Sequence, residues 1–395
     1  MKMEKVILFG CGRYGEVAYK YYGKERILCY IDNNPKIIGT KVNGITVRKV
    51  EDVIMENIDY KVILCSAYYE EMAKQLQRLG CTNYEILCEM KRFYPSTEFI
   101  NNPYQSSWER RDITEEELIQ SYSCDVNRVD LINNRTDLCY QNLELFNQVE
   151  IETINRCNGV CDFCPVNKNY DTREFHKMTR TLFESIIFQL SELNYSGKIA
   201  LYSNNEPFLD EDIISKYKYL REKLPKAYIH LWTNGTLLTM DKFKEVVQYL
   251  DEMVIDNYQQ ELRLIKPVQE VVEYCEKNSE LKKRVTIVLR KPHEILSNRG
   301  GEAHNRKKES LYPDVKCPLP FKQLIIRPDG KVSLCCNDPL GKNTLGDLNQ
   351  ESVLDVWYGE KYKQVRECIF KGRKHWKNCE YCDALNAGGN GEYIC

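Results

Sequence analysis

Short apolar segments alternate with amphipathic stretches in the first ninety residues. Four apolar segments predict strands: Lys5–Phe9, Ile27–Ile31, Lys61–Ser66 and Tyr84–Leu87. Between the last two, Tyr69–Leu79 has apolar residues at helical spacing. Alternation of this kind predicts a small parallel sheet covered by helices. We therefore expect an α/β domain at residues 1–92.

A second, longer alternation begins at Gln148. Six segments predict strands: Val149–Ile154, Lys198–Tyr202, Tyr228–Trp232, Met253–Ile255, Arg284–Leu289 and Gln323–Ile326. Four amphipathic stretches predict helices between them: Thr181–Leu193, Glu211–Lys223, Met240–Leu250 and Leu262–Cys275. About six βα units in a row predict a partial (β/α)6 TIM barrel with its function at the carboxyl ends of the strands.

Length and charge limit the classes of protein. At 395 residues the chain is long enough for two or three domains. We expect the first domain at 1–92, a polar linker with short helices at 93–146, the barrel at 147–310 and a cysteine-rich domain at 311–395. Lys and Arg number 56 against 58 Asp and Glu, so no nucleic-acid partner is indicated. The sequence predicts neither a membrane span nor a signal peptide, and a cytoplasmic protein is expected.

Eighteen cysteines are the strongest compositional signal. In a large intracellular chain, clustered thiols favour metal ligation over disulfides. Cys157, Cys161 and Cys164 directly follow the first barrel strand. Three thiolates so close together can bind three corners of a four-iron cluster and leave the fourth iron open, which is typical of a catalytic site. A zinc loop is the alternative, but no fourth Cys or His follows before His176.

This loop resembles the signature of the radical SAM superfamily, in which an aromatic residue, here Phe163, precedes the last cysteine. The resemblance spans about residues 149–330. It implies a [4Fe–4S] cluster that cleaves S-adenosylmethionine (SAM), oxygen-sensitive radical chemistry, and an external reductant such as flavodoxin or ferredoxin. Residues after later strands match the SAM contacts of the family: Asn205, Glu206, Pro207, Thr233, Asn234, Gly235 and Asp256. Of these, Glu206 is expected to bind the SAM ammonium group.

The segment beyond Cys317 has little apolar sequence for a core of its own, so we expect metal to stabilise it. Cys317, Cys335, Cys379 and Cys382 can supply four ligands. Their arrangement resembles the twitch or SPASM extension of radical SAM enzymes, which implies one auxiliary [4Fe–4S] cluster. Cys336 is an alternative ligand to Cys335, and a zinc ribbon is the alternative to the cluster.

Gly10, Gly12 and Gly15 lie between the first strand and its helix, and Asp32 follows the second strand. This pattern resembles a dinucleotide-binding fold. The domain is only about half as long as a full fold of that kind, and it looks similar to the small Rossmann-like modules of sugar-nucleotide modifying enzymes. We expect it either to bind a nucleotide or sugar through these residues or to have lost its ligand.

Arg290, Asn298 and Arg299 follow the fifth barrel strand and are candidates for contacts with SAM or substrate; solvated loop residues are the alternative. The predicted activity is a radical SAM oxidoreductase, of dehydrogenase or epimerase type, that acts on a sugar, cyclitol or nucleotide-linked sugar. The alternatives are a peptide maturase and a non-catalytic electron carrier. The glycine-loop domain, present where many peptide maturases have a peptide-recognition module, favours the sugar class.

Overall fold

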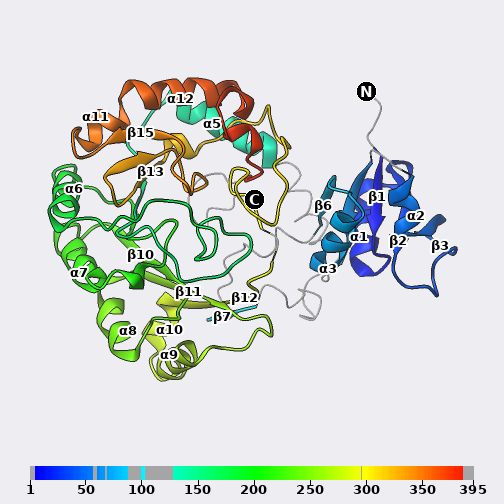
Figure 1. Cartoon of the computed structure of the whole chain (residues 1–395), viewed down its shortest axis with the longest axis horizontal. Helices are drawn as coiled ribbons and strands as arrows, with labels where there is room; N and C mark the ends of the chain where they lie inside the picture. The colour runs from blue at the N-terminus through cyan, green and yellow to red at the C-terminus, as the bar shows by residue number, and fades with distance from the viewer. Residues whose placement is uncertain are drawn as a thin grey trace. The chain divides into compact units, whose positions relative to one another are not determined.

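The computed structural model describes residues 5–56, 60–66, 69–87, 99–102, 128–294 and 296–385. The chain forms two compact units, which are described separately here (Figure 1). One comprises Met1–Pro95, Pro103–Arg128 and Cys395, and the other comprises Ser96–Asn102 and Val129–Ile394. Within the described ranges, no helix is long and apolar enough to cross a membrane.

The amino-terminal unit is built on a six-stranded sheet in the order β3-β4-β2-β1-β5-β6. Its elements are β1 (Val6–Phe9), α1 (Arg13–Tyr22), β2 (Ile27–Asp32), β3 (Lys41–Val42), β4 (Ile45–Lys49), α2 (Val50–Met55), β5 (Lys61–Leu64), α3 (Tyr69–Arg78) and β6 (Tyr84–Ile86). The expected strands and helix are present. Sequence analysis missed the β3–β4 hairpin, whose two-residue turn has positive φ at Asn43 and Gly44. Asn-Gly is the usual sequence for such a turn.

The glycine loop between β1 and α1 is closed by contacts within the chain. A Cβ added to Gly15 would lie 2.3 Å from the carbonyl oxygen of Gly10, and one added to Gly10 would lie 2.7 Å from that of Cys65. The Asp32 carboxylate accepts a hydrogen bond from the backbone N–H of Cys11 at 3.0 Å. A Cβ on Gly12 would meet nothing within 4 Å. Packing therefore requires two of the three glycines, and Asp32 binds the loop itself.

The second unit contains one nine-stranded sheet in the order β15-β14-β13-β8-β9-β10-β11-β12-β7. Its strands are β7 (Ile100–Asn101), β8 (Gln148–Ile151), β9 (Lys198–Ala200), β10 (Tyr228–Thr233), β11 (Glu252–Tyr258), β12 (Val285–Arg290), β13 (Gln323–Ile326), β14 (Lys331–Ser333) and β15 (Thr344–Asp347). Its α-helices are α5 (Arg128–Gln141), α6 (Arg180–Glu192), α7 (Ile213–Lys223), α8 (Met240–Val246), α9 (Lys266–Glu276), α10 (Ser279–Arg284), α11 (Val353–Trp357) and α12 (Glu360–Lys371). Helices α6 to α9 lie along the outer side of the sheet (Figure 1).

At its two ends, this sheet contains strands that the predicted series of βα units did not include. Strand β7 comes from the segment expected to be a linker, and it pairs in parallel with β12. Strand β13, last of the six predicted strands, pairs with β8, the first. It also pairs with β14, which begins the antiparallel part of the sheet. One sheet therefore runs from the barrel into the cysteine-rich region. The predicted parallel α/β architecture is otherwise confirmed.

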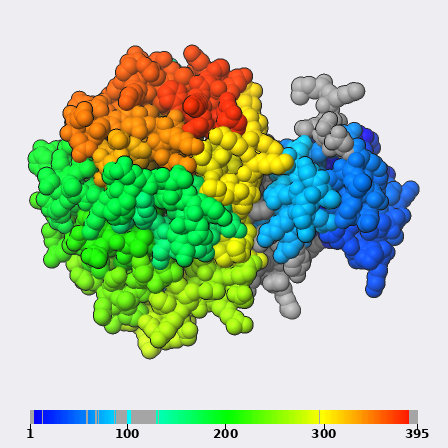
Figure 2. Space-filling model, viewed as in Figure 1, coloured from blue at the N-terminus to red at the C-terminus, as the bar shows by residue number. Residues whose placement is uncertain are grey.

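The cysteine-rich region shares the apolar core of the barrel. Trp357 is fully buried, donates from its indole N–H to the carbonyl of Glu144 at 3.2 Å, and packs edge-on against Phe146. The backbone N–H of Val353 donates to the side chain of Gln189 on α6 at 2.8 Å. Helix α11 contacts α6, and in Figure 2 the orange region borders the green region of the barrel. We expected metal to stabilise this region because it has little apolar sequence for a core of its own. The structure shows that packing on the apolar core of the barrel also stabilises it.

The glycine loop gives a stability prediction. Gly15→Ala should destabilise the amino-terminal unit by about 1–3 kcal/mol, because the added methyl overlaps the Gly10 carbonyl. Gly12→Ala is the matched control and should leave stability nearly unchanged. Urea denaturation of the full chain, followed by far-UV circular dichroism, measures both. Equal midpoints for the two variants would contradict the packing described here.

Candidate active site

The loop after β8 places the first two of the three expected cysteines around one glycine. A Cβ added to Gly159 would lie 3.3 Å from the Sγ of Cys157 and 3.9 Å from the Sγ of Cys161. A larger residue there would crowd the Cys157 sulfur. The Asn167 side chain, which sequence analysis missed, donates from Nδ2 to the carbonyls of Cys161 and Cys164 at 2.9 Å each. It therefore fixes the curvature of the loop.

The chemistry of these donors fits an iron–sulfur cluster. Burial, together with the charges of Glu206 and Cys164, raises the pKa of the Cys157 thiol to about 12. Burial and the other two thiols raise the pKa of Cys161. Thiols in this position ionise when a cationic iron centre compensates their charge. Among the described His, Cys, Asp and Glu residues, no three are placed to share a single ion.

Glu206 connects the loops after β9 and β10. Its Oε1 accepts hydrogen bonds from the Thr233 hydroxyl at 2.7 Å and from the Phe208 N–H at 3.1 Å, and its Oε2 accepts from the Asn234 N–H at 2.8 Å. The side chain is buried, and Pro207 starts a short 3-10 turn beside it. These bonds use three of the carboxylate's roughly four acceptor positions. The structure thus uses Glu206 to position the Thr-Asn-Gly turn, and the direct contact with SAM stays a prediction for the remaining acceptor position.

That turn touches the cysteine loop. Asn234 donates from Nδ2 to the Asn158 side chain at 2.8 Å, and the same nitrogen lies 4.0 Å from the Cys157 sulfur. Gly235 has φ of 72°, and a Cβ there would lie 2.7 Å from Val268. Glycine is therefore required at this position for two independent reasons. The ends of β8, β9 and β10 meet at the cysteines.

Asn204 connects the loops after β8 and β9 to the cysteine-rich region. Its N–H donates to Glu152 at 2.6 Å, and its carbonyl accepts from Arg173 at 3.1 Å. Its side-chain oxygen accepts a hydrogen bond from Arg299, and its Nδ2 donates to the carbonyl of Cys336 at 3.3 Å. Arg299, predicted as a contact residue, therefore binds the same asparagine that contacts Cys336 of the cysteine-rich region.

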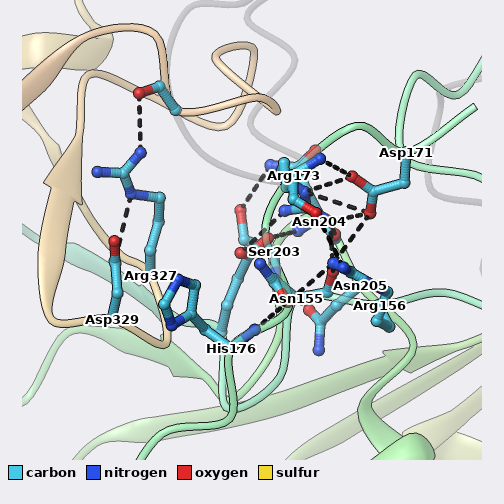
Figure 3. A network of polar contacts seen from close by, with 12 residues as sticks. Asn155, Arg156, Asp171, Arg173, His176, Ser203, Asn204, Asn205, Arg327 and Asp329 are labelled. Carbon is cyan, nitrogen blue, oxygen red and sulfur yellow. Dashed lines mark hydrogen bonds and ion pairs between the residues drawn. The ribbon is translucent and has the colours of Figure 1, made fainter.

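Arg173 is a second residue that no motif predicted. Its guanidinium contacts Glu152 at 3.3 Å and Asp171 at 2.9 Å, and it donates to the carbonyl of Asn155 at 2.9 Å. Burial raises the pKa of Glu152 while Arg173 lowers it. Figure 3 shows Arg173 at the centre of these contacts. The cation therefore allows a carboxylate to be buried beneath the site.

Two more predicted contact residues are brought together by β11 and β12. The Arg290 guanidinium lies 3.4 Å from Asp256 and 3.5 Å from Glu294. Burial raises the pKa of Asp256, and Arg290 partly offsets that shift. Phe163, next to the last cysteine of the loop, packs against Tyr258 with ring centroids 6.1 Å apart. The aromatic residue of the signature therefore contacts the barrel interior.

The side chains of two predicted contact residues, Asn298 and Asn205, differ in their hydrogen-bond partners. Asn298 is buried; its Nδ2 donates to the carbonyl of Tyr381 and its Oδ1 accepts from the N–H of Asp383. These bonds hold the Cys379–Cys382 turn, and the ligand contact of Asn298 stays a prediction. The Oδ1 of Asn205 accepts a hydrogen bond from the Ser203 N–H at 3.0 Å. Its buried Nδ2 has no hydrogen-bond partner in the described part of the chain, which leaves a donor for a ligand.

The four predicted cysteines of the second set also converge: Cys317, Cys335, Cys379 and Cys382. Burial raises the pKa of Cys335, and so do the charges of Cys336 and of the other three. Burial also raises the pKa of Cys336, on which the charges of Glu150, Arg299, Cys382 and Cys317 act. Cys335 stays the predicted fourth ligand, with Cys336 as the alternative.

Family models match three parts of the chain. One described as the radical SAM superfamily matches residues 151–262, and SPASM, an iron–sulfur cluster-binding domain, matches residues 317–383. A third, described as C2185-like, N-terminal, matches residues 2–87. The first implies a [4Fe–4S] cluster and SAM, and the second implies auxiliary iron–sulfur clusters. The predicted cofactor classes are therefore confirmed.

Individual relatives agree with the family models. The S-adenosyl-L-methionine-dependent 2-deoxy-scyllo-inosamine dehydrogenase of Niallia circulans is 23% identical over 254 residues, which cover 63% of this chain and 98% of the relative. A crystal structure of BtrN in complex with AdoMet and 2-DOIA is similar in fold, with a TM-score of 0.53 and 24% identity over 61% of this chain and 94% of that chain. A structure of anSMEcpe with bound AdoMet matches with a TM-score of 0.41 and 15% identity over 60% of this chain and 88% of that chain. The chain therefore contains a radical SAM domain followed by a SPASM iron–sulfur cluster-binding domain.

Proposed function

We propose that this protein is a radical SAM dehydrogenase that oxidises a hydroxyl-bearing carbon of a small polar substrate, a cyclitol or a sugar. The polar interior of the barrel is the observation that supports this substrate class. Alternate strand residues such as Val149 and Ile151 pack on the helices. The residues between them face the other side of the sheet.

Glu150, Ala200 and His230 lie at one level of β8, β9 and β10. Gln148 donates to Glu150 at 2.7 Å, and the Tyr202 hydroxyl contacts Nδ1 of His230 at 3.1 Å. All five residues are buried. Ala200, the residue between them in the sheet, carries only a methyl group. The carboxylate and the imidazole therefore offer a bound molecule polar groups from the strands on either side of β9.

Several of these groups lack partners. Gln148 Oε1, His230 Nε2 and Gln323 Oε1 are buried and make no hydrogen bond within the described residues. Burial lowers the pKa of His230 to about 3, so its ring is neutral and can donate or accept one bond. Leaving such a group unsatisfied costs about 1–3 kcal/mol. A substrate with several hydroxyl groups can satisfy them, whereas an aliphatic side chain of a peptide cannot.

The reaction class follows from the relative. The enzyme of Niallia circulans is named for the dehydrogenation of 2-deoxy-scyllo-inosamine, a cyclitol, and this chain spans nearly all of it. We infer a similar oxidation here, with the substrate itself left to experiment. A flavodoxin or ferredoxin in the cytoplasm would supply electrons. Ligand binding by Gly12 and its neighbours in the amino-terminal unit stays a prediction.

The residues of the chain have separate roles in this proposal. When bound at Cys157, Cys161 and Cys164, the cluster and SAM supply a 5′-deoxyadenosyl radical that takes one hydrogen atom from the substrate carbon. Glu150 accepts the hydroxyl proton. Cys317, Cys335, Cys379 and Cys382 would hold a cluster able to accept the remaining electron, and loss of a hydrogen atom, a proton and an electron converts the alcohol to a carbonyl. Asn205 offers its free Nδ2 to SAM.

SAM cleavage tests the site. The reconstituted protein under dithionite should release 5′-deoxyadenosine, and Ala at Cys157, Cys161 and Cys164 together should abolish release. Glu206→Gln should keep the iron but weaken SAM binding about tenfold or more, because a bond to a buried charged group contributes about 1.5–3 kcal/mol. The exposed Glu211→Gln is the matched control. Unchanged SAM affinity in Glu206→Gln would refute the positioning role.

The proton acceptor gives a pH dependence. Burial raises the pKa of Glu150 to about 7, against the lowering effect of Ser203 and Gln148, so the carboxylate form predominates only above that pH. Oxidation of 2-deoxy-scyllo-inosamine should therefore fall as the pH drops below about 7, about tenfold per unit. Glu150→Gln should lower turnover about 100-fold and abolish the fall in activity below pH ~7, which is the acidic limb of the pH profile. The exposed Glu144→Gln is the control and should keep both the turnover and the acidic limb. An unchanged limb in Glu150→Gln would show that another group accepts the proton.

A further inference from the structure

One arginine of the SPASM domain is buried without a carboxylate partner. Arg373 is 1% exposed and donates to the carbonyls of Cys382 and Ala384, at 2.8 Å each. Its Nε has no hydrogen-bond partner in the described chain. Asp383, the acidic residue nearest in sequence, pairs with Arg306 at 3.2 Å. No described carboxylate oxygen lies within 4 Å of the Arg373 guanidinium nitrogens.

Such an arrangement is costly unless an anion lies nearby. An unpaired charge removed from water costs several kcal/mol, and a guanidinium cannot lose its proton to avoid that cost. The negative charges that act on Arg373 are first those of the thiols Cys382, Cys317 and Cys379, and after them that of Asp383. By geometry, the guanidinium is hydrogen-bonded to the backbone of one of the four proposed ligands, Cys382.

We propose that Arg373 is the counter-charge of the auxiliary cluster and raises its reduction potential. Four thiolates around a [4Fe–4S] core give a net negative group, which becomes more negative on reduction. A fixed positive charge in a buried site stabilises the reduced form more than the oxidised form. The consequence for catalysis rests on the proposed function, because a higher potential favours removal of an electron from the substrate.

Arg366 provides a matched comparison in the same domain. It is also buried and donates to two carbonyls, of Pro320 at 3.0 Å and Trp357 at 2.7 Å. Its guanidinium lies over the rings of Trp357 and Tyr362, at 4.2 and 4.5 Å from their centroids. Aromatic faces thus compensate this cation. The charges that act on Arg366 come from tyrosines and not from thiols.

The test is a redox titration followed by electron paramagnetic resonance. The full chain carries Ala at 157, 161 and 164, so that only the auxiliary cluster contributes, and neither SAM nor substrate is needed. Arg373→Gln should lower the equilibrium constant for reduction of the auxiliary cluster at least tenfold, which is a downward shift in potential of about 59 mV for one electron. Arg373→Lys retains the charge and should change this constant less than about threefold. Arg366→Gln should leave the potential unchanged.

An unchanged potential in Arg373→Gln with full iron content would overturn the proposal, and so would an equal shift in Arg366→Gln. If Arg373→Gln loses its iron, Arg373→Lys decides: retained iron at the wild-type potential supports the counter-charge. Loss of iron from both Arg373 variants, with Arg366→Gln intact, would mean that the shape of the guanidinium matters and would also overturn it. If the protein did not oxidise the substrate in the activity assay, the potential of the auxiliary cluster measured in this titration would still test the role of Arg373.

Discussion

Two buried carboxylates, Glu152 and Glu206, are the constraint on which the site depends. Each is removed from water at the carboxyl end of the sheet, and each needs donors in fixed positions. Glu152 obtains them from Asn204 and Arg173, and Glu206 obtains them from the turn after β10. The donors belong to the same loops that contact the cysteines. Satisfying the carboxylates therefore places the loops of β8, β9 and β10 relative to one another.

The continuous sheet relates the two sets of cysteines. Strand β13 pairs with β8, which leads to the cysteine loop of the barrel, and with β14, which leads to Cys335 and Cys336. The shared apolar core around Trp357 reinforces this connection. Asn204 and Arg299 lie where the two regions meet. A substrate in the barrel interior would thus have radical chemistry on one side and an electron acceptor on the other.

Periodicity was sufficient for most of the fold, because buried parallel strands and amphipathic helices leave clear patterns over five to twelve residues. It failed for β7, a two-residue strand whose existence depends on the exposed edge of β12. It also could not show that β13 returns to β8. Spacing predicted the cysteine ligands, because metal ligation needs particular residue types at short intervals. Arg173, Asn167 and Arg373 were missed, since each compensates a buried group that only the folded chain creates. Glu206 was recognised as important, but its hydrogen-bond partners come from a loop 27 and 28 residues away.

The central claim is that one thiol site has an open iron for SAM and the other does not. Electron paramagnetic resonance of the reduced, reconstituted chain tests it most directly, with and without SAM. We expect signals from two kinds of cluster, of which SAM changes only the one that disappears when Cys157, Cys161 and Cys164 are replaced by Ala. If SAM instead changed the signal that remains in that variant, or changed neither signal, the assignment of the two sites would be contradicted.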